Sequence, residues 1–102
     1  MKQIKDTNNY ESMVVISSQC TEAKLKIIAF GYAQQLKKLG ASDISVVSRG
    51  RRDFAYTSKR SQIGYFVEMY FNSSPQILPI YKNKLKLDKN IIRSFITNLD
   101  IK

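Results

Sequence analysis

Residues 48–71 read SRGRRDFAYTSKRSQIGYFVEMYF, and this stretch decides the fold. It opens with a basic cluster, passes through an aromatic segment and a polar turn, and ends in the apolar segment 63–71. Two such segments predict a β-hairpin, or a close pair of strands with a wider turn. Four of the five arginines of the chain lie here. Because the planar guanidinium group matches phosphate oxygens and can stack on bases, the stretch indicates binding to RNA or another polyanion.

Outward from this hairpin, hydrophobic periodicity predicts the remaining elements. Residues 11–17 are rich in β-branched side chains with apolar residues on both faces, which is typical of a central strand. Residues 21–39 carry an apolar stripe at helical spacing, with Thr21 as a cap and Gly40 as a stop. A second strand begins at residue 43 and reaches residue 56 if Gly50 marks a bulge. The third strand is expected at residues 64–71.

The C-terminal part predicts one more helix and one more strand. Ser73-Ser74-Pro75 is a helix-start pattern, but Pro79 crowds the first turn, so the helix either bends there or begins nearer Pro79. Residues 90–99 predict the fourth strand. The order is β-α-β-β-α-β, the α+β class with the ferredoxin-like split β-α-β arrangement. We therefore expect a four-stranded antiparallel sheet with two helices on one face and the other face open to a partner.

Composition limits the function. The 102 residues predict a flexible N-terminal extension at 1–9 and a single domain at 10–102. The net charge of +9 favours nucleic acid or an anionic surface as partner. Cys20 is the only cysteine and there is no histidine, which disfavours most hydrolase and metalloenzyme functions. We expect no metal, no cofactor and no enzyme activity. We also expect no membrane span, no targeting segment and no small-molecule substrate.

The chain resembles the bacterial-type small-subunit ribosomal protein S6 family over residues 10–100. The likeness rests on the order and spacing of short motifs: Tyr10-Glu11, Leu36-Lys37-Lys38-Leu39-Gly40-Ala41, Gly50-Arg51-Arg52 before Ala55-Tyr56, Gly64-Tyr65-Phe66, and Leu85-Lys86-Leu87-Asp88 with Asn90 and Arg93. Three residues depart from the family pattern: Thr57, where the family usually has proline, Asp53, where an apolar residue is common, and Pro79, which interrupts the second helix. The resemblance implies the split β-α-β fold and a structural constituent of the small ribosomal subunit. It also implies binding to small-subunit rRNA in the platform together with ribosomal protein S18.

Eight basic residues are the candidate contacts with RNA or with the protein partner. The first choice is the basic cluster, Arg49, Arg51 and Arg52. Lys59 and Arg60 of the turn and Lys86 and Lys89 at the end of the last helix are further candidates. Arg93 is suggested by the family pattern. Lysines on a helix are often only solvated. Aromatic residues of the hairpin could stack on bases, although most are expected in the core: Phe54, Tyr56, Tyr65, Phe66 and Tyr70.

Other interpretations remain open at this stage. A stand-alone RNA-recognition module of the same topology would bind single-stranded RNA, but the aromatic spacing at Gly64-Tyr65-Phe66 lacks the small residue such modules place between their aromatics. A small-molecule regulatory module or a small hydrolase has no supporting motif. Glu11 and Glu68 could form a carboxylate pair, although surface ion pairing is the simpler interpretation. The lysine-, isoleucine- and asparagine-rich composition fits a plastid (chloroplast) ribosome, and a bacterial cytoplasm fits nearly as well.

Overall fold

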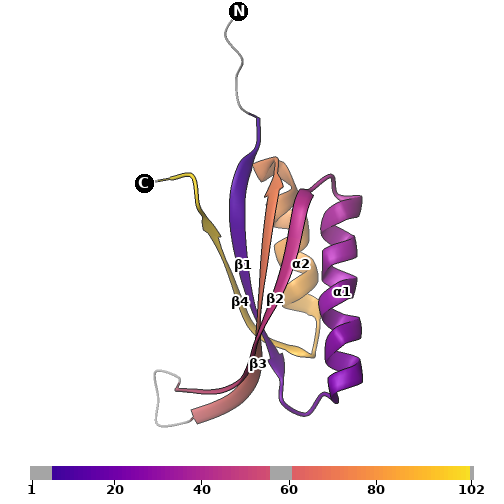
Figure 1. Ribbon diagram of the computed structural model, residues 1–102, viewed down its shortest axis with the longest axis vertical. Coiled ribbons are helices and arrows are strands. Elements are labelled where there is room, and N and C mark those ends of the chain that lie inside the picture. Colours follow the sequence, from indigo (N-terminus) through magenta and orange to yellow (C-terminus); the bar gives the residue numbers. More distant parts are fainter. Residues whose placement is uncertain (1–5, 56–60, 102) are drawn as a thin grey trace, which may run out of the picture.

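The computed structural model describes residues 6–55 and 61–101, and it has the predicted order of strands and helices. The elements are β1 (Asn8–Ser17), α1 (Glu22–Lys38), β2 (Ser42–Ala55), β3 (Ser61–Ser73), the 3-10 turn η1 (Pro75–Ile77), α2 (Leu78–Leu87) and β4 (Ile91–Asn98). The four strands form one antiparallel sheet in the order β2-β3-β1-β4, and both helices cover the same face of it (Figure 1). The predicted fold is therefore confirmed, with β1 in the centre as expected. No described helix has the length and apolar character that crossing a membrane requires.

Local signals set the helix boundaries. The Thr21 hydroxyl accepts a hydrogen bond from the backbone N–H of Lys24 at 3.2 Å, and Gly40 follows the helix with a φ of 102°. The two prolines near the second helix lie in different elements. Pro75 is the first residue of η1, whose cap is Ser74, and Pro79 lies in the first turn of α2. Of the two predicted arrangements, the start near Pro79 is the observed one. Proline is tolerated there because backbone N–H groups in the first turn of a helix have no partner within the helix, so the missing N–H of proline costs no hydrogen bond.

The N-terminal boundary differs from the prediction. β1 begins at Asn8, so residues 8 and 9 belong to the sheet and not to the extension expected at 1–9. The backbone N–H of Asn9 donates to Asp100 Oδ2 at 2.9 Å, and its carbonyl accepts from Leu99 N at 2.8 Å. Residues 8 and 9 also pair with Ser73 and Asn72 of β3. Pairing with β3 and contacts with the segment after β4 therefore order a polar segment that has no apolar pattern of its own.

The core lies between the sheet and the two helices, and its centre is Tyr81 of α2, which is fully buried. The Tyr81 hydroxyl and the buried Ser12 hydroxyl of β1 lie 2.8 Å apart. Aromatic rings extend from this point in both directions: Tyr81 packs on Phe71 at 5.9 Å between ring centroids and on Tyr32 at 6.3 Å, and Phe71 packs on Tyr10 at 5.6 Å. This series of contacts joins α1, α2, β3 and β1. Burial raises the pKa of Tyr81 to about 12, so its hydroxyl is neutral at physiological pH.

We expect Tyr81→Phe to destabilise the protein by about 1–3 kcal/mol, because the buried Ser12 hydroxyl loses its partner. The double variant Ser12→Ala/Tyr81→Phe should lose less than the sum of the two single variants, since it removes both polar groups. Urea denaturation measures these differences. Tyr65→Phe, a half-buried ring outside this pair, is the control. Strict additivity would contradict the coupling.

Candidate nucleic-acid interface

A β-bulge sets the basic cluster at the start of a long arm. Ser48 pairs with Val67 and Gly50 pairs with Phe66, so Arg49 is the extra residue between them, and Gly50 has a φ of 84°. This confirms the bulge predicted at Gly50, where an L side chain would be strained. Beyond it the β2–β3 hairpin continues past the last paired residue of β1, Ser17 opposite Gly64 (Figure 1). We call residues 51–55 and 61–65 the arm.

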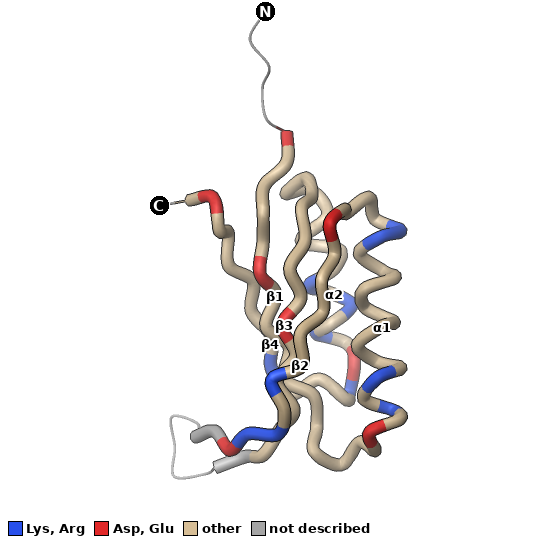
Figure 2. Tube along the Cα trace, viewed as in Figure 1, with Lys and Arg blue, Asp and Glu red and all other residues tan. Residues whose placement is uncertain are grey.

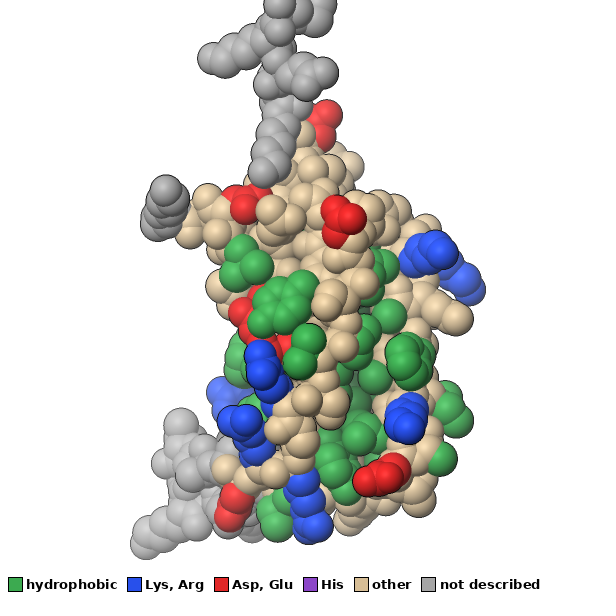
Figure 3. Space-filling view, viewed as in Figure 1, with side chains coloured by type: hydrophobic (Ala, Val, Ile, Leu, Met, Phe, Trp, Pro, Cys, Tyr) green, Lys and Arg blue, Asp and Glu red, His purple; other side chains and the backbone are tan. Residues whose placement is uncertain are grey.

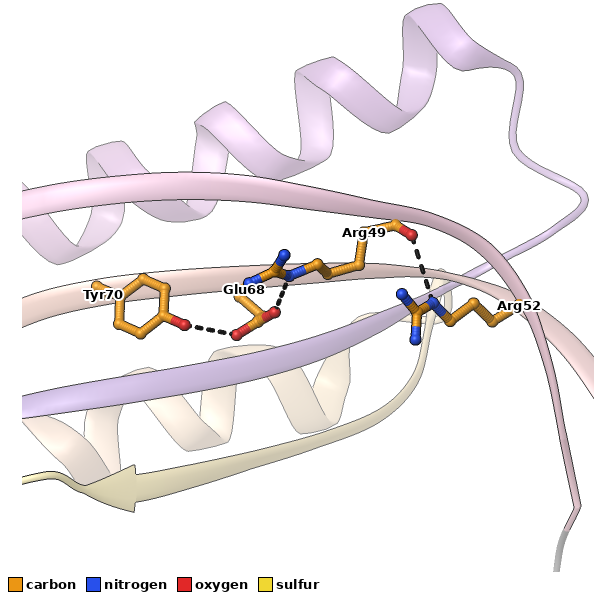
Figure 4. Close-up of polar contacts among 4 residues, drawn as sticks. All are labelled: Arg49, Arg52, Glu68 and Tyr70. Atoms are coloured by element: carbon orange, nitrogen blue, oxygen red, sulfur yellow. Dashed lines mark hydrogen bonds and ion pairs between the residues drawn. The ribbon is translucent and has the colours of Figure 1, made fainter.

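The face of the sheet opposite the helices carries an ionic cluster, built from Arg49, Glu68 and Tyr70 (Figure 4). The Arg49 guanidinium donates to one oxygen of the Glu68 carboxylate, and the Tyr70 hydroxyl donates to the other at 2.7 Å. Glu68 is buried, whereas about half of the Arg49 side chain is exposed. The carboxylate is therefore held from two sides and fixes the bulge residue against the middle of the sheet.

Glu11 completes this cluster from β1. Hydrogen bonds from Glu11, Tyr70 and Arg49 lower the pKa of Glu68 to about 2, and the hydrogen bond with Glu68 raises the pKa of Glu11 above its usual 4.5. Glu11 lies opposite Tyr70 in the register, diagonal to Glu68. The two acids therefore form the carboxylate pair that the sequence analysis treated as the weaker interpretation. The ion pair with Arg49 is present as well, so both interpretations describe part of one cluster.

Arg51 and Arg52 lie at the base of the arm, and both side chains are exposed. Arg52 Nε donates to the backbone carbonyl of Arg49 at 3.4 Å, so the ionic cluster also supports the path of the next arginine (Figure 4). Lysine and arginine residues gather along the trace where the arm leaves the sheet (Figure 2), and their side chains lie on the surface there (Figure 3). Arg49 is engaged by an acid, and the outer positive charge of the arm therefore comes from Arg51 and Arg52.

The register brings a fourth arginine to the same end of the sheet. Val15 pairs with Arg93 on one side and with Phe66 on the other, and Phe66 pairs with Gly50. Paired residues share a face, so this row crosses the open face from β4 to the bulge, about 14 Å at the usual strand spacing. The next row towards the other end carries Glu68. The open face is thus basic at the end with the arm and acidic in its middle.

The remaining basic candidates lie elsewhere. Lys86 is exposed on α2 and Lys89 is exposed in the turn between α2 and β4, away from the bulge in the chain and in the sheet order. Lys59 and Arg60 fall outside the described residues. The structure therefore places Arg49, Arg51 and Arg52 at the bulge, and it places Arg93 at the other side of the sheet in the row that ends at Gly50. Lys86 lies near Arg93, since both line the pocket between α2 and β4.

The aromatic candidates divide between the two faces. Tyr65 packs against the core, while Phe66 and Tyr70 are half-buried on the open face, where the Tyr70 hydroxyl is bound to Glu68. Phe54 has no described side chain and Tyr56 lies outside the described residues. Phe95 of β4 is 52% exposed beside this face. The sequence analysis missed Phe95. Successive residues of a strand point to opposite faces, so the core position of its neighbour Ile96 places Phe95 on the open face.

The fold and the basic arm define a class, the split β-α-β proteins with an open sheet face. A solved structure of 30S ribosomal protein S6 from Thermotoga maritima superposes with a TM-score of 0.81, covering 90% of this chain and 87% of that one at 24% identity. The family model described as ribosomal protein S6 matches residues 9–98. The chain belongs to the ribosomal protein S6 family and is a structural component of the small ribosomal subunit, not an enzyme.

Curated relatives come from plastids and bacteria. Small ribosomal subunit protein bS6c of Trieres chinensis is 39% identical over 90% of this chain and 96% of its own length. Small ribosomal subunit protein bS6 of Trichormus variabilis is 27% identical over 82% of this chain and 78% of its own. The chain is therefore a ribosomal component of the plastid or bacterial kind, as its composition and motifs predicted.

We expect Glu11→Gln to stabilise the protein relative to wild type at pH 7 and to lose that advantage near pH 4. The raised pKa of Glu11 means that its carboxyl stabilises the folded state when protonated, below the usual 4.5, and that this contribution is lost as the pH rises through the raised value. Glutamine keeps a donor for Glu68 at every pH.

Urea denaturation at several pH values measures this difference, with exposed Glu22→Gln as the control. The pH dependence of the Glu68 contribution to stability is the opposite, because its pKa is lowered: the contribution is present above pH 4.5 and is lost as the pH falls towards 2. A pH-independent difference between Glu11→Gln and wild type would contradict the shared carboxyl pair.

Proposed function

We propose that this protein binds small-subunit rRNA through the base of its β2–β3 arm and does so on the platform together with ribosomal protein S18. The observation that carries the proposal is the pair Arg51 and Arg52, which is exposed on a hairpin that extends beyond the rest of the sheet. Guanidinium groups presented in this way suit phosphate oxygens of a folded RNA, where shape and backbone contacts dominate recognition.

The ionic cluster supports this role of the arm. Glu68 neutralises Arg49 and holds it on the sheet, and the Arg49 carbonyl accepts from Arg52. The base of the arm is therefore ordered before RNA arrives, which lowers the entropy lost on binding. Lys59 and Arg60 of the turn remain predicted contacts. So do Lys86, Lys89 and Arg93, with RNA or with the protein partner.

The second candidate, a stand-alone module for single-stranded RNA, has less support. Such modules direct two aromatic rings from neighbouring positions of one face towards successive bases. Here Tyr65 packs on the core side and Phe66 lies on the open side. The hydroxyl of the other open-face aromatic of β3, Tyr70, is held by Glu68. A small-molecule or hydrolase function is not favoured by any contact described here.

We expect Arg51→Ala/Arg52→Ala to weaken binding to the central domain of small-subunit rRNA. The slope of log affinity against log salt should fall by about 0.7 to 0.9 for each phosphate that the variant no longer neutralises. Filter binding across a salt series measures both quantities. Lys24→Ala/Lys37→Ala, which removes two exposed charges from α1, is the matched control. Equal losses in the two variants would mean that only net charge matters.

We expect tight rRNA binding to require ribosomal protein S18. The same assay is run with and without S18, and a short unstructured RNA serves as the competitor. Binding that is tight only with S18 and that resists the competitor supports assembly on the platform. Equal binding to any single strand, with no effect of S18, would favour the stand-alone RNA-recognition module instead.

A further inference from the structure

A groove of about 540 Å³ runs between α2 and β4. It lies at the β4 edge of the sheet, and β2 forms the other edge. All six residues from 91 to 96 of β4 line it, together with Lys82, Leu85 and Lys86 of α2. Successive side chains of a strand point to opposite faces. A groove that six consecutive residues border therefore follows the outer edge of the strand.

This edge is open to pairing. β4 is the last strand in the described sheet, and β1 is its neighbour on the inner side. An edge strand presents backbone N–H and C=O groups that another extended chain can pair with, and many peptide-binding domains use this mode. The register of β4 shifts at Ile92, between the residues opposite Val15 and Ile16. The strand is otherwise regular from Arg93 to Asn98.

The groove is apolar inside and basic at its rim. Leu85 is buried at its base and Ile96 packs against the core, whereas Phe95 is 52% exposed on the open-face side. Lys82 and Lys86, one helical turn apart on α2, are exposed along one side. The described lining residues also include Arg93 and contain no aspartate or glutamate. The charge and shape fit an extended segment with acidic and apolar residues in alternation.

We propose that an acidic, extended segment of a partner protein docks in this groove as an added strand beside β4. In an added strand, side chains alternate between the two faces, so acidic residues on one face meet Lys82 and Lys86 of α2 while apolar residues on the other meet Phe95. The proposal goes beyond rRNA binding, because it assigns Lys82 and Lys86 to a protein partner. RNA fits less well, since the floor is aliphatic and bases prefer aromatic faces.

The test uses a short fluorescein-labelled peptide of alternating glutamate and valine as the probe. Fluorescence anisotropy measures its affinity for the full chain, and amide chemical shifts locate it. We expect shifts concentrated at residues 91–96, and a Kd raised about tenfold or more by Lys82→Glu/Lys86→Glu. The matched control, Lys24→Glu/Lys37→Glu on α1, makes the same change in charge and should alter the Kd less than about twofold.

A second probe separates strand addition from simple charge attraction. The same peptide with every backbone amide N-methylated keeps its charge but has no N–H group to donate to the edge, and it should lose most of its affinity. This comparison needs no protein variant, so it holds even if a charge reversal impairs folding. Equal binding of the two peptides, shifts outside β4, or displacement of the peptide by an RNA oligonucleotide at residues 91–96 would each overturn the proposal. Because the assay contains no rRNA target, its failure leaves the rRNA proposal standing.

Discussion

The buried hydrogen bond between Tyr81 and Ser12 is the contact on which the arrangement of the domain depends. It places a polar pair in the middle of an apolar core, where, among the described residues, each hydroxyl is satisfied by the other or by the nearby Met69 sulfur. An unsatisfied buried hydroxyl lowers the stability of the folded state, so this pair fixes both the position of α2 along β1 and the distance between α2 and the sheet. The aromatic contacts to Phe71 and Tyr32 then tie β3 and α1 to the same point.

Fixing α2 also determines what each edge of the sheet presents. The β2 edge borders α1 and continues into the arm, while the β4 edge borders α2 and keeps a groove with a basic rim. A ribosomal protein with two dissimilar edges can contact RNA with one and protein with the other. The open face between them is divided by the Glu11–Glu68 pair, which places negative charge between the arginines and the far end of the sheet. On the open face, the described arginines therefore lie at the end with the arm and the acidic pair lies in the middle.

The sequence predicted the architecture well because its signals are local. Alternation in residues 64–71, the helical stripe of 21–39 and the sharp backbone turn at Gly50 each report one element, and their order allows few topologies. Pro79 was ambiguous, since proline is compatible with both a bent helix and a late start, and only packing of Ile77 and Tyr81 in the core selects the latter. Asn8 and Asn9 gave no strand signal, because the residues that order them are distant in the chain: both pair with the end of β3, and Asn9 also bonds residues 99 and 100.

The sequence by itself therefore determined the fold class, the positive charge and the membership of a ribosomal family, since composition and short motifs carry these. It also identified the arginines of the bulge as candidates. Only the tertiary structure decided how those arginines are used: Arg49 is neutralised by Glu68, Arg51 and Arg52 remain exposed, and Arg93 lies in a row across the sheet. Such assignments depend on strand register, and register joins residues that are distant in the chain and share no local pattern.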